Sequence, residues 1–224
     1  FPLVRIDPSR ILHRDEHFLF VQKLAGELTV RGSGPVRKLP LLDLLRQQEP
    51  GIHPVNRLDF ATSGIVIFAR TRKALAAARA CSFRKTYWAL VAGSSRQQTG
   101  VIRAPLPARS GRGEVPAETR YRVLERFPGC ALVEAEIQGG GRQHQIRRHF
   151  AAIGHPLVLD SDYGDAGFNR AFTRHHHYRR FFLHAASVSF RHPFTGHPIT
   201  VHAPIPKAFA DMLGLWRRSD RAVR

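Results

Sequence analysis

Asp59 is the residue of this chain best placed to do chemistry. It lies in residues 57–64 (Arg-Leu-Asp-Phe-Ala-Thr-Ser-Gly), where a short polar turn leads into the apolar run 65–69. A carboxylate where a loop enters a strand is well supported and open to a ligand. It could act as a nucleophile or as a general base. The alternative is structural, because an Asp after a turn often binds nearby backbone N–H groups.

A second group of polar side chains follows the glycines at 139–141. Five of the ten residues 141–150 are Arg or His. Helical spacing would place His144 and Arg147 on one face, with Arg148 close by. Glycines before a helix leave backbone N–H groups that can meet a phosphate. An ordinary solvated basic helix is the alternative.

A third candidate is the aromatic pair Tyr87 and Trp88, which follows Lys85 in an apolar segment. Neighbouring residues of a strand point to opposite faces of the sheet, so we expect one ring in the core and the other in a cleft. For Trp88 core packing is the better interpretation. An aromatic ring on a strand can stack on an unpaired base.

The charge of the chain indicates a polyanionic partner. The chain has 35 Lys+Arg against 17 Asp+Glu, a net charge of +18. Basic residues occur along the whole length, which favours a folded surface that binds nucleic acid over a disordered basic arm. A high-GC genome would explain arginine over lysine but not the net excess. The histidines at 175–177 lie between arginines, so an RNA-facing loop is favoured over a metal site.

Composition narrows the class of protein further. Residues of hydrophobic type make up 43% of the 224 residues, enough for a core. No apolar run approaches the length needed to cross a bilayer, so we expect no membrane association. The two cysteines have no metal-like or redox spacing, so we expect reduced thiols and a cytoplasmic location.

The order of elements predicts an α+β fold. Strands are expected near 18–21, 64–70, 86–91, 121–127, 131–137, 180–190 and 198–202, and helices near 40–47, 71–84, 142–153 and 206–216. Residues 94–116, which could contact RNA, and 160–177 are expected to be long polar loops. Hairpin connections dominate, which predicts a mixed, mostly antiparallel sheet flanked by helices. We expect one domain over 1–224, with peripheral tails at 1–11 and 217–224.

Taken together and in this order, the motifs resemble the RluA-type pseudouridine synthases. The matching segments run from about Leu12 to Pro206: an opening strand with Lys23 in the lysine position, then 57–64, 85–93, 117–126, 141–149, 154–164, 183–185 and 192–196. Within the family, the tRNA pseudouridine synthase C branch looks nearest, on the clues at 147–149 and 164–172. As in that branch, no RNA-binding S4 domain is expected.

The resemblance implies an isomerase that turns uridine in RNA into pseudouridine without a metal or a cofactor. The N1–C1′ bond breaks, the flipped base turns, and C5 joins C1′. It implies that Asp59 is the catalytic residue, attacking C1′ or stabilising positive charge there. Tyr87 would stack on the uracil and could receive or relay the C5 proton. Arg147 would pair with Asp59 and orient it.

The resemblance also implies a set of substrate-binding residues around a central cleft that divides the sheet. Arg57 would fill the space of the flipped base, while Ile146 and Leu183 would wall the uracil pocket. The remaining predicted substrate contacts are Lys23, Arg142, His144, Gln145 and Arg148.

The chain departs from the family pattern at three positions, where Leu24, Asn56 and Leu159 replace Pro, His and Gly. These changes affect local turn geometry and target choice more than chemistry. The expected partner is RNA, with tRNA favoured and ribosomal RNA possible, and the expected state is a monomer. The rival functions are a non-catalytic RNA-binding module and a hydrolase of the N-glycosidic bond.

Overall fold

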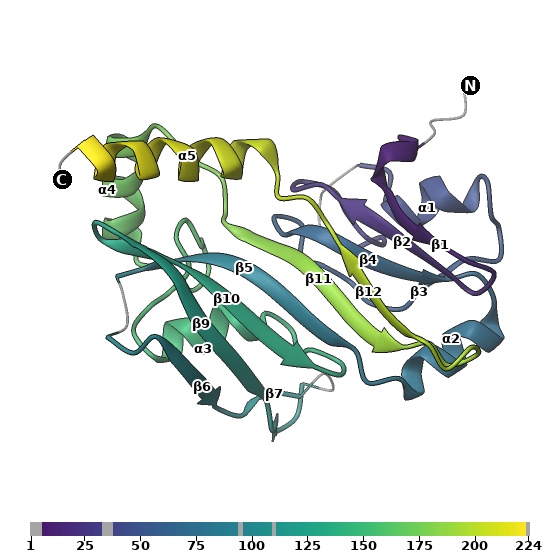
Figure 1. Cartoon of the computed structure of the whole chain (residues 1–224). Coiled ribbons are helices and arrows are strands. Elements are labelled where there is room, and N and C mark those ends of the chain that lie inside the picture. The colour runs from purple at the N-terminus through teal and green to yellow at the C-terminus, as the bar shows by residue number, and fades with distance from the viewer. Residues whose placement is uncertain (1–5, 33–37, 94–95, 109–110, 223–224) are drawn as a thin grey trace. The chain divides into compact units, whose positions relative to one another are not determined.

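The computed structural model describes residues 6–32, 38–93, 96–108 and 111–222 (Figure 1). The chain forms two compact units, which we describe separately. The first comprises Phe1–Lys85 and Ala185–Pro204, and the second comprises Thr86–His184 and Ile205–Arg224. Strands β5 (Arg84–Ala92) and β11 (Leu183–Arg191) each continue from one unit into the other. The expectation of one catalytic domain divided by a cleft stays a prediction.

The first unit is a sheet with two short helices. Its strands follow the order β1 (Ile11–Arg14), β2 (Phe18–Lys23), β4 (Ser63–Ala69) and β11, while β3 (His53–Pro54) pairs with β4 and β12 (Pro198–His202) pairs with β11. The pairs β1–β2, β2–β4, β3–β4 and β11–β12 are antiparallel. The helical elements are the 3-10 turn η1 (Pro8–Arg10), α1 (Leu41–Arg46) and α2 (Arg72–Ala80).

Strand β4 is the centre of the first unit because both of its faces are buried. Ile65 and Ile67 pack in one core with residues of α2, whereas Val66 and Phe68 pack in a second core with residues of α1. A continuous apolar run, rather than an alternating one, is what such a strand requires. Helix α2 begins where predicted, since the Thr71 side chain accepts a hydrogen bond from the Ala74 N–H.

The second unit is a sheet in the order β5, β10 (Cys130–Gln138), β9 (Glu118–Phe127), β6 (Thr99–Arg103), with a small hairpin of β7 (Leu106–Pro107) and β8 (Glu114–Val115). Its helices are α3 (Gln145–Ala152), α4 (Ala166–His176) and α5 (Lys207–Ala222). The β9–β10 hairpin turns at Gly129, as predicted, with a φ of 75°. One core of this unit joins Leu90 and Leu132 to Phe172 and Leu213.

The α+β architecture with antiparallel hairpins is confirmed, but both predicted loops were wrong in part. Residues 94–116 contain β6, β7 and β8, and residues 160–177 contain α4. Helix α5 continues to Ala222, where a tail was expected, and α3 begins three residues later than predicted. Of the two predicted tails and the 94–116 loop, residues 1–5, 94–95, 109–110 and 223–224 lie outside the described part.

The sequence of α4 contains a helical pattern that its many polar residues made difficult to recognise. Phe168, Phe172 and His176 recur at every fourth position, and Phe172 is buried. The Asp165 side chain accepts a hydrogen bond of 2.5 Å from the Phe168 N–H and caps the helix. Polar residues between these apolar positions made the segment read as a loop.

Candidate active site

The loop that carries Asp59 is tied to the rest of the first unit through its backbone. The Thr29 hydroxyl lies 3.3 Å from both the N–H and the carbonyl oxygen of Leu58. The Thr62 N–H donates to the Asp59 carbonyl oxygen at 3.1 Å, closing the turn. Thr29 is buried, so water cannot readily compete for these contacts. Asp59 itself is half-buried, which fits a carboxylate on a well-braced, accessible loop.

Lys23 lies beneath this loop and is fully buried. Its Nζ donates to the carbonyl oxygens of Thr62 at 2.6 Å, Phe60 at 3.1 Å and Leu24 at 3.1 Å. Burial lowers the pKa of Lys23 to about 8, although the nearby carboxylates of Glu27 and Asp59 act in the opposite direction. This position favours a role in holding the Asp59 loop over the direct substrate contact that the sequence predicts.

The end of the loop requires a glycine. Gly64 has a φ of 113°, and a Cβ there would lie 2.3 Å from the Ala185 carbonyl oxygen. Backbone of β4 and β11 therefore approaches too closely at this point for any side chain. Asn56, which replaces a histidine of the family pattern, accepts a hydrogen bond from the Ile67 N–H at 2.8 Å and so fixes the entry to the loop. Arg57 is exposed.

In the second unit, Tyr87 and Trp88 have different environments on β5. Trp88 packs against the hydrophobic core of the unit, as predicted. Tyr87 is buried, with 8% of its surface exposed. Ile146 and Leu183, the predicted walls of the uracil pocket, are also buried. Their roles toward a uracil ring stay predictions.

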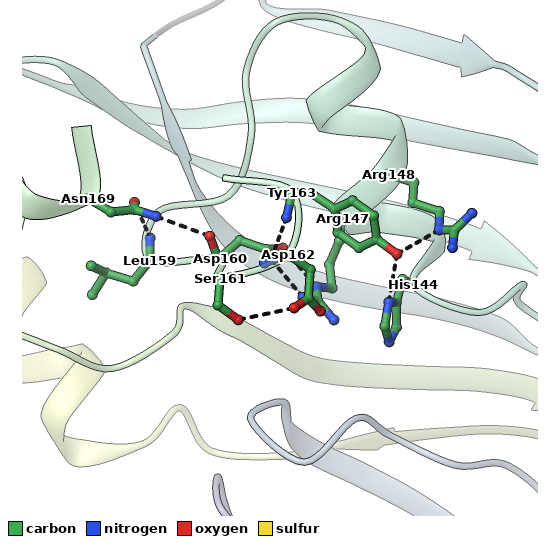
Figure 2. A network of polar contacts seen from close by, with 9 residues as sticks. All are labelled: His144, Arg147, Arg148, Leu159, Asp160, Ser161, Asp162, Tyr163 and Asn169. Carbon is green, nitrogen blue, oxygen red and sulfur yellow. Dashed lines mark hydrogen bonds and ion pairs between the residues drawn. The ribbon is translucent and has the colours of Figure 1, made fainter. Parts of the chain in front are cut away.

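Arg147 on α3 is held by two aspartates that sequence reasoning did not assign (Figure 2). Its Nε and Nη2 donate to the two carboxylate oxygens of Asp160 at 2.7 and 2.6 Å, and Nη2 also donates to Asp162 at 2.7 Å. The side chains of Arg147 and Asp160 are 8% and 0% exposed. Such a bidentate pair fixes the plane of the guanidinium.

The Asp160 carboxylate stays ionised in this setting. Burial by itself would raise the pKa of Asp160, but hydrogen bonds from Arg147 and from the N–H groups of Asp162 and Tyr163 outweigh it and lower the pKa. The two N–H contacts measure 2.9 and 3.1 Å. The turn at Asp160 therefore presents an ionised carboxylate that holds the Arg147 guanidinium in place.

The turn around Asp160 is itself braced by its neighbours. Leu159 has a left-handed φ of 62°, which is unfavourable for leucine and explains why the family pattern has glycine there. The Asn169 side chain accepts from the Leu159 N–H at 2.8 Å and donates to the Asp160 carbonyl oxygen at 3.0 Å. A Cβ on Gly164 would lie 2.2 Å from that same oxygen. Asn169 thus compensates for the strain at Leu159.

Tyr163 gathers the basic side chains of α3 (Figure 2). Its phenol oxygen lies 2.9 Å from His144 Nδ1 and accepts from Arg148 Nε at 2.8 Å. The guanidinium carbons of Arg147 and Arg148 lie 5.0 and 5.3 Å from the centre of the ring. His144, Arg147 and Arg148 all contact Tyr163, but His144 lies just before α3 in a left-handed conformation and not on the helix, where the predicted helical spacing placed it. Tyr163 lies in residues 154–164, which resemble a family motif, and this resemblance could have identified it as a site residue.

Gln145 connects the start of α3 to strand β9. Its side chain accepts from the Arg142 N–H at 2.9 Å and donates to the Glu118 carbonyl oxygen at 2.8 Å and to the Thr119 hydroxyl at 3.2 Å. Gln145 is buried, whereas Arg142 is exposed. These contacts favour a positioning role for Gln145, while Arg142 stays accessible to a substrate.

The predicted catalytic residues fall in both units. Asp59, Arg57 and Lys23 lie in the first unit, and the other predicted site residues, including Tyr87 and Arg147, lie in the second. The pairing of Arg147 with Asp59 and the placement of Tyr87 against the same substrate stay predictions. Within the described ranges, no group of three or more His, Cys, Asp or Glu side chains is arranged to hold a metal ion. No helix among those residues is long and apolar enough to span a membrane.

Comparison with known proteins decides the family. Residues 17–152 match the family model described as RNA pseudouridylate synthase. The chain belongs to this family. The resemblance derived from the motifs is thereby confirmed.

The curated relatives carry a ribosomal name. The chain is 38% identical over 207 residues to the ribosomal large subunit pseudouridine synthase C of Vibrio vulnificus, covering 87% of this chain and 65% of that protein. It is 36% identical over 211 residues to the protein of that name from Escherichia coli, covering 87% and 66%. The chain thus spans about 65% of the length of the relatives it matches. The names of these relatives therefore do not confirm the predicted tRNA branch.

Solved structures support the fold. Human RNA pseudouridylate synthase domain containing 1 is 25% identical with a TM-score of 0.68, covering 88% of this chain and 83% of that one. The human domain containing 4 has a TM-score of 0.74 at 21% identity and covers 93% of both chains, which supports the fold alone.

Proposed function

We propose that this chain is an RNA pseudouridine synthase that isomerises a uridine of large-subunit ribosomal RNA. The observation that carries the proposal is the intact Asp59 loop of a family member, braced from below by Lys23 and Thr29. The names of the relatives favour ribosomal RNA. Transfer RNA is the second candidate, on the sequence clues at 147–149 and 164–172.

Asp59 would act at C1′ of the flipped uridine. Either the carboxylate attacks C1′ as the N1–C1′ bond breaks, or it stabilises the positive charge that develops there. The detached uracil then turns and C5 bonds to C1′, a step that in the first route breaks the bond between C1′ and the Asp59 carboxylate. The C5 proton leaves, and N1 gains a proton. Tyr87 would stack on the ring and could receive or relay the C5 proton. The product is an isomer of the substrate, so the balance needs no oxidant, reductant or co-reactant.

Arg147 would orient Asp59 while Asp160 orients Arg147. A guanidinium has five N–H donors, so one arginine can serve several carboxylates at once. The contacts from Nε and Nη2 to Asp160 hold the group in one plane. A preoriented guanidinium loses little rotamer freedom when it meets a further carboxylate. These contacts support the proposal that Asp160 orients Arg147 and that Arg147 in turn orients Asp59.

The remaining predicted residues divide into two kinds. The exposed Arg57 would enter the space of the flipped base, and Ile146 and Leu183 would wall the uracil. Arg142, His144 and Arg148 would meet the RNA backbone. By their buried contacts, Lys23 and Gln145 would hold loops and not touch RNA. Action on ribosomal RNA also fits the cytoplasmic location and the monomeric state that the sequence predicts.

The test is tritium release from RNA labelled at uridine C5. Unmodified transcripts of large-subunit ribosomal RNA and of tRNA are incubated with the protein, and carbodiimide mapping locates each pseudouridine. We expect release from the ribosomal transcript. Release from tRNA alone would indicate that tRNA, and not ribosomal RNA, is the substrate. Free uracil would indicate a hydrolase, and binding without release would indicate a non-catalytic module.

Replacing Asp59 with Asn separates catalysis from binding. The amide has nearly the same shape but cannot act as a carboxylate, so we expect turnover to fall by about 10³-fold or more while RNA affinity changes less than about threefold. Single-turnover tritium release and fluorescence anisotropy measure the two quantities. Equal loss of both would assign Asp59 a structural role.

A further inference from the structure

The C-terminal part of α4 and the segment after it form an exposed basic surface that the proposed reaction does not use. We call it the α4 basic surface, and its exposed members are Arg170, Arg174, His175, His177, Arg179 and Arg180. Residues 166–180 contain neither Asp nor Glu. Four arginines within eleven residues give this surface a high local density of positive charge.

The arginines of this surface differ from exposed arginines on strands β6 and β9. There, Arg103 and Arg122 form ion pairs with Glu118 and Glu134 at 2.8 and 3.0 Å. Within the part of the chain that the structure describes, Arg170, Arg174, Arg179 and Arg180 form no ion pair. Uncompensated charge of one sign repels itself, and a polyanion offers the missing counter-charge.

The helix dipole explains part of this surface but not all of it. Cations in the last turn of a helix are favourable, which accounts for Arg174 and His175. Helix α4 ends at His176, so Arg179 and Arg180 lie beyond the reach of that effect. Their presence calls for a different reason.

A packed scaffold presents the α4 basic surface. The His176 ring accepts a hydrogen bond of 3.1 Å from the Trp216 indole on α5, and the Phe172 ring lies 5.8 Å from the same indole. Beyond the helix, Tyr178 stacks on Phe182 at 4.6 Å. The apolar members of the segment thus anchor it, and the basic members face solvent.

Both ends of the segment connect to the network around Arg147. Helix α4 starts three residues after Tyr163, with Asp165 as its cap. At the other end, the Phe181 ring lies 5.2 Å from the Arg147 guanidinium carbon. Arg179 and Arg180 immediately precede Phe181, so their Cα atoms lie within about 8 Å of its Cα. Both ends of the segment that carries the surface are therefore close in the chain to residues that contact Arg147 or lie in its network.

We propose that the α4 basic surface binds backbone phosphates of the RNA that flanks the target uridine. The proposal rests on the proposed function for the identity of the polyanion. Arginines contact two phosphate oxygens at once, and such contacts fix register without reading sequence. The surface would hold the strand that leads away from the flipped nucleotide.

The test compares two triple variants that remove the same charge. In the first, Arg174, Arg179 and Arg180 are replaced by Gln; in the control, the sheet arginines Arg103, Arg120 and Arg122 are replaced by Gln. Binding to a labelled transcript of large-subunit ribosomal RNA is measured by anisotropy between about 50 and 200 mM salt. We expect at least about tenfold weaker binding for the first variant and a log–log salt slope shallower by about two. The control should differ from wild type by less than about threefold.

A third variant protects the test against misfolding. Replacing the same three residues by Lys keeps the charge, so it should retain most of the affinity and the wild-type salt slope, whereas a structural role would make it fail like the Gln variant. Equal affinity and slope in the Gln variant and the control would overturn the proposal. Failure of the proposed function is separate, because it would appear as absent tritium release by wild-type protein that still binds RNA.

Discussion

Arg147 and Asp160 form a pair in which each side chain depends on the other. Both are buried, so removing one partner leaves a charge in a poorly solvated site, and this costs more than the pair itself contributes. The sequence could predict Arg147, because it falls in a helix with a recognisable pattern. Sequence spacing could not identify Asp160 as the partner of Arg147. Their contact depends on the left-handed conformation of Leu159, which a leucine does not lead one to predict.

We expect Asp160→Asn to lower the free energy of unfolding at pH 7 by about 3 kcal/mol and turnover by tenfold or more, because Arg147 loses its counter-charge. A lowered carboxyl pKa stabilises the fold above the ordinary pKa and is lost as the pH falls through the folded value. The stability gap to wild type should therefore shrink from about pH 4 downwards. Urea unfolding at several pH values measures it. A gap that stays constant down to pH 2 would contradict the prediction.

Lys23 gives a prediction in the opposite pH range. Its folded pKa of about 8 lies below the ordinary 10.5, so between these values the unfolded chain binds more protons and stability rises with pH. Relative to Lys23→Met, wild type should gain roughly 1–3 kcal/mol between pH 8 and 10.5. Comparing the two proteins cancels the titration of other groups. No change in their difference over this range would mean that Lys23 is hydrated.

At the scale of elements, the hydrophobic pattern and the capping and turn residues predicted where several helices, strands and turns lie. The apolar run of β4, the Thr71 cap of α2 and the turn of the β9–β10 hairpin at Gly129 all appear where expected. Helix α4 was missed because its apolar positions are separated by polar residues. The late start of α3 follows from His144, whose φ of 54° is not helical.

The close approach of β4 to β11 makes Gly64 sensitive to any added side chain. We expect Gly64→Ala to destabilise the protein by about 3 kcal/mol or more, because the new methyl group would overlap the Ala185 backbone at a positive φ. Gly51→Ala is the matched control, since its Cβ would lie an ordinary 3.5 Å from the Arg70 carbonyl oxygen. Thermal unfolding of both variants measures the effect. Equal melting temperatures would be the contrary result.

At the scale of the molecule, a net charge of +18 predicts strong dependence on ionic strength. Counterion release weakens RNA binding as salt rises, so KM for the ribosomal transcript should increase at least about tenfold between 50 and 200 mM salt. Initial rates of tritium release at several RNA concentrations measure KM. A KM independent of salt would show that phosphate contacts contribute little. The charge and the order of motifs predicted the family, whereas the choice of RNA depends on surfaces that no motif describes.

The bond between Trp216 and His176 has a practical consequence. The chain has two tryptophans, so Trp88→Phe would leave the indole on α5 as the single emitter. That indole contacts His176 in the segment that carries the exposed arginines of the α4 basic surface. RNA that binds to those arginines should then change the emission wavelength and intensity of Trp216. Binding could be followed by this intrinsic fluorescence, with no dye attached to either molecule.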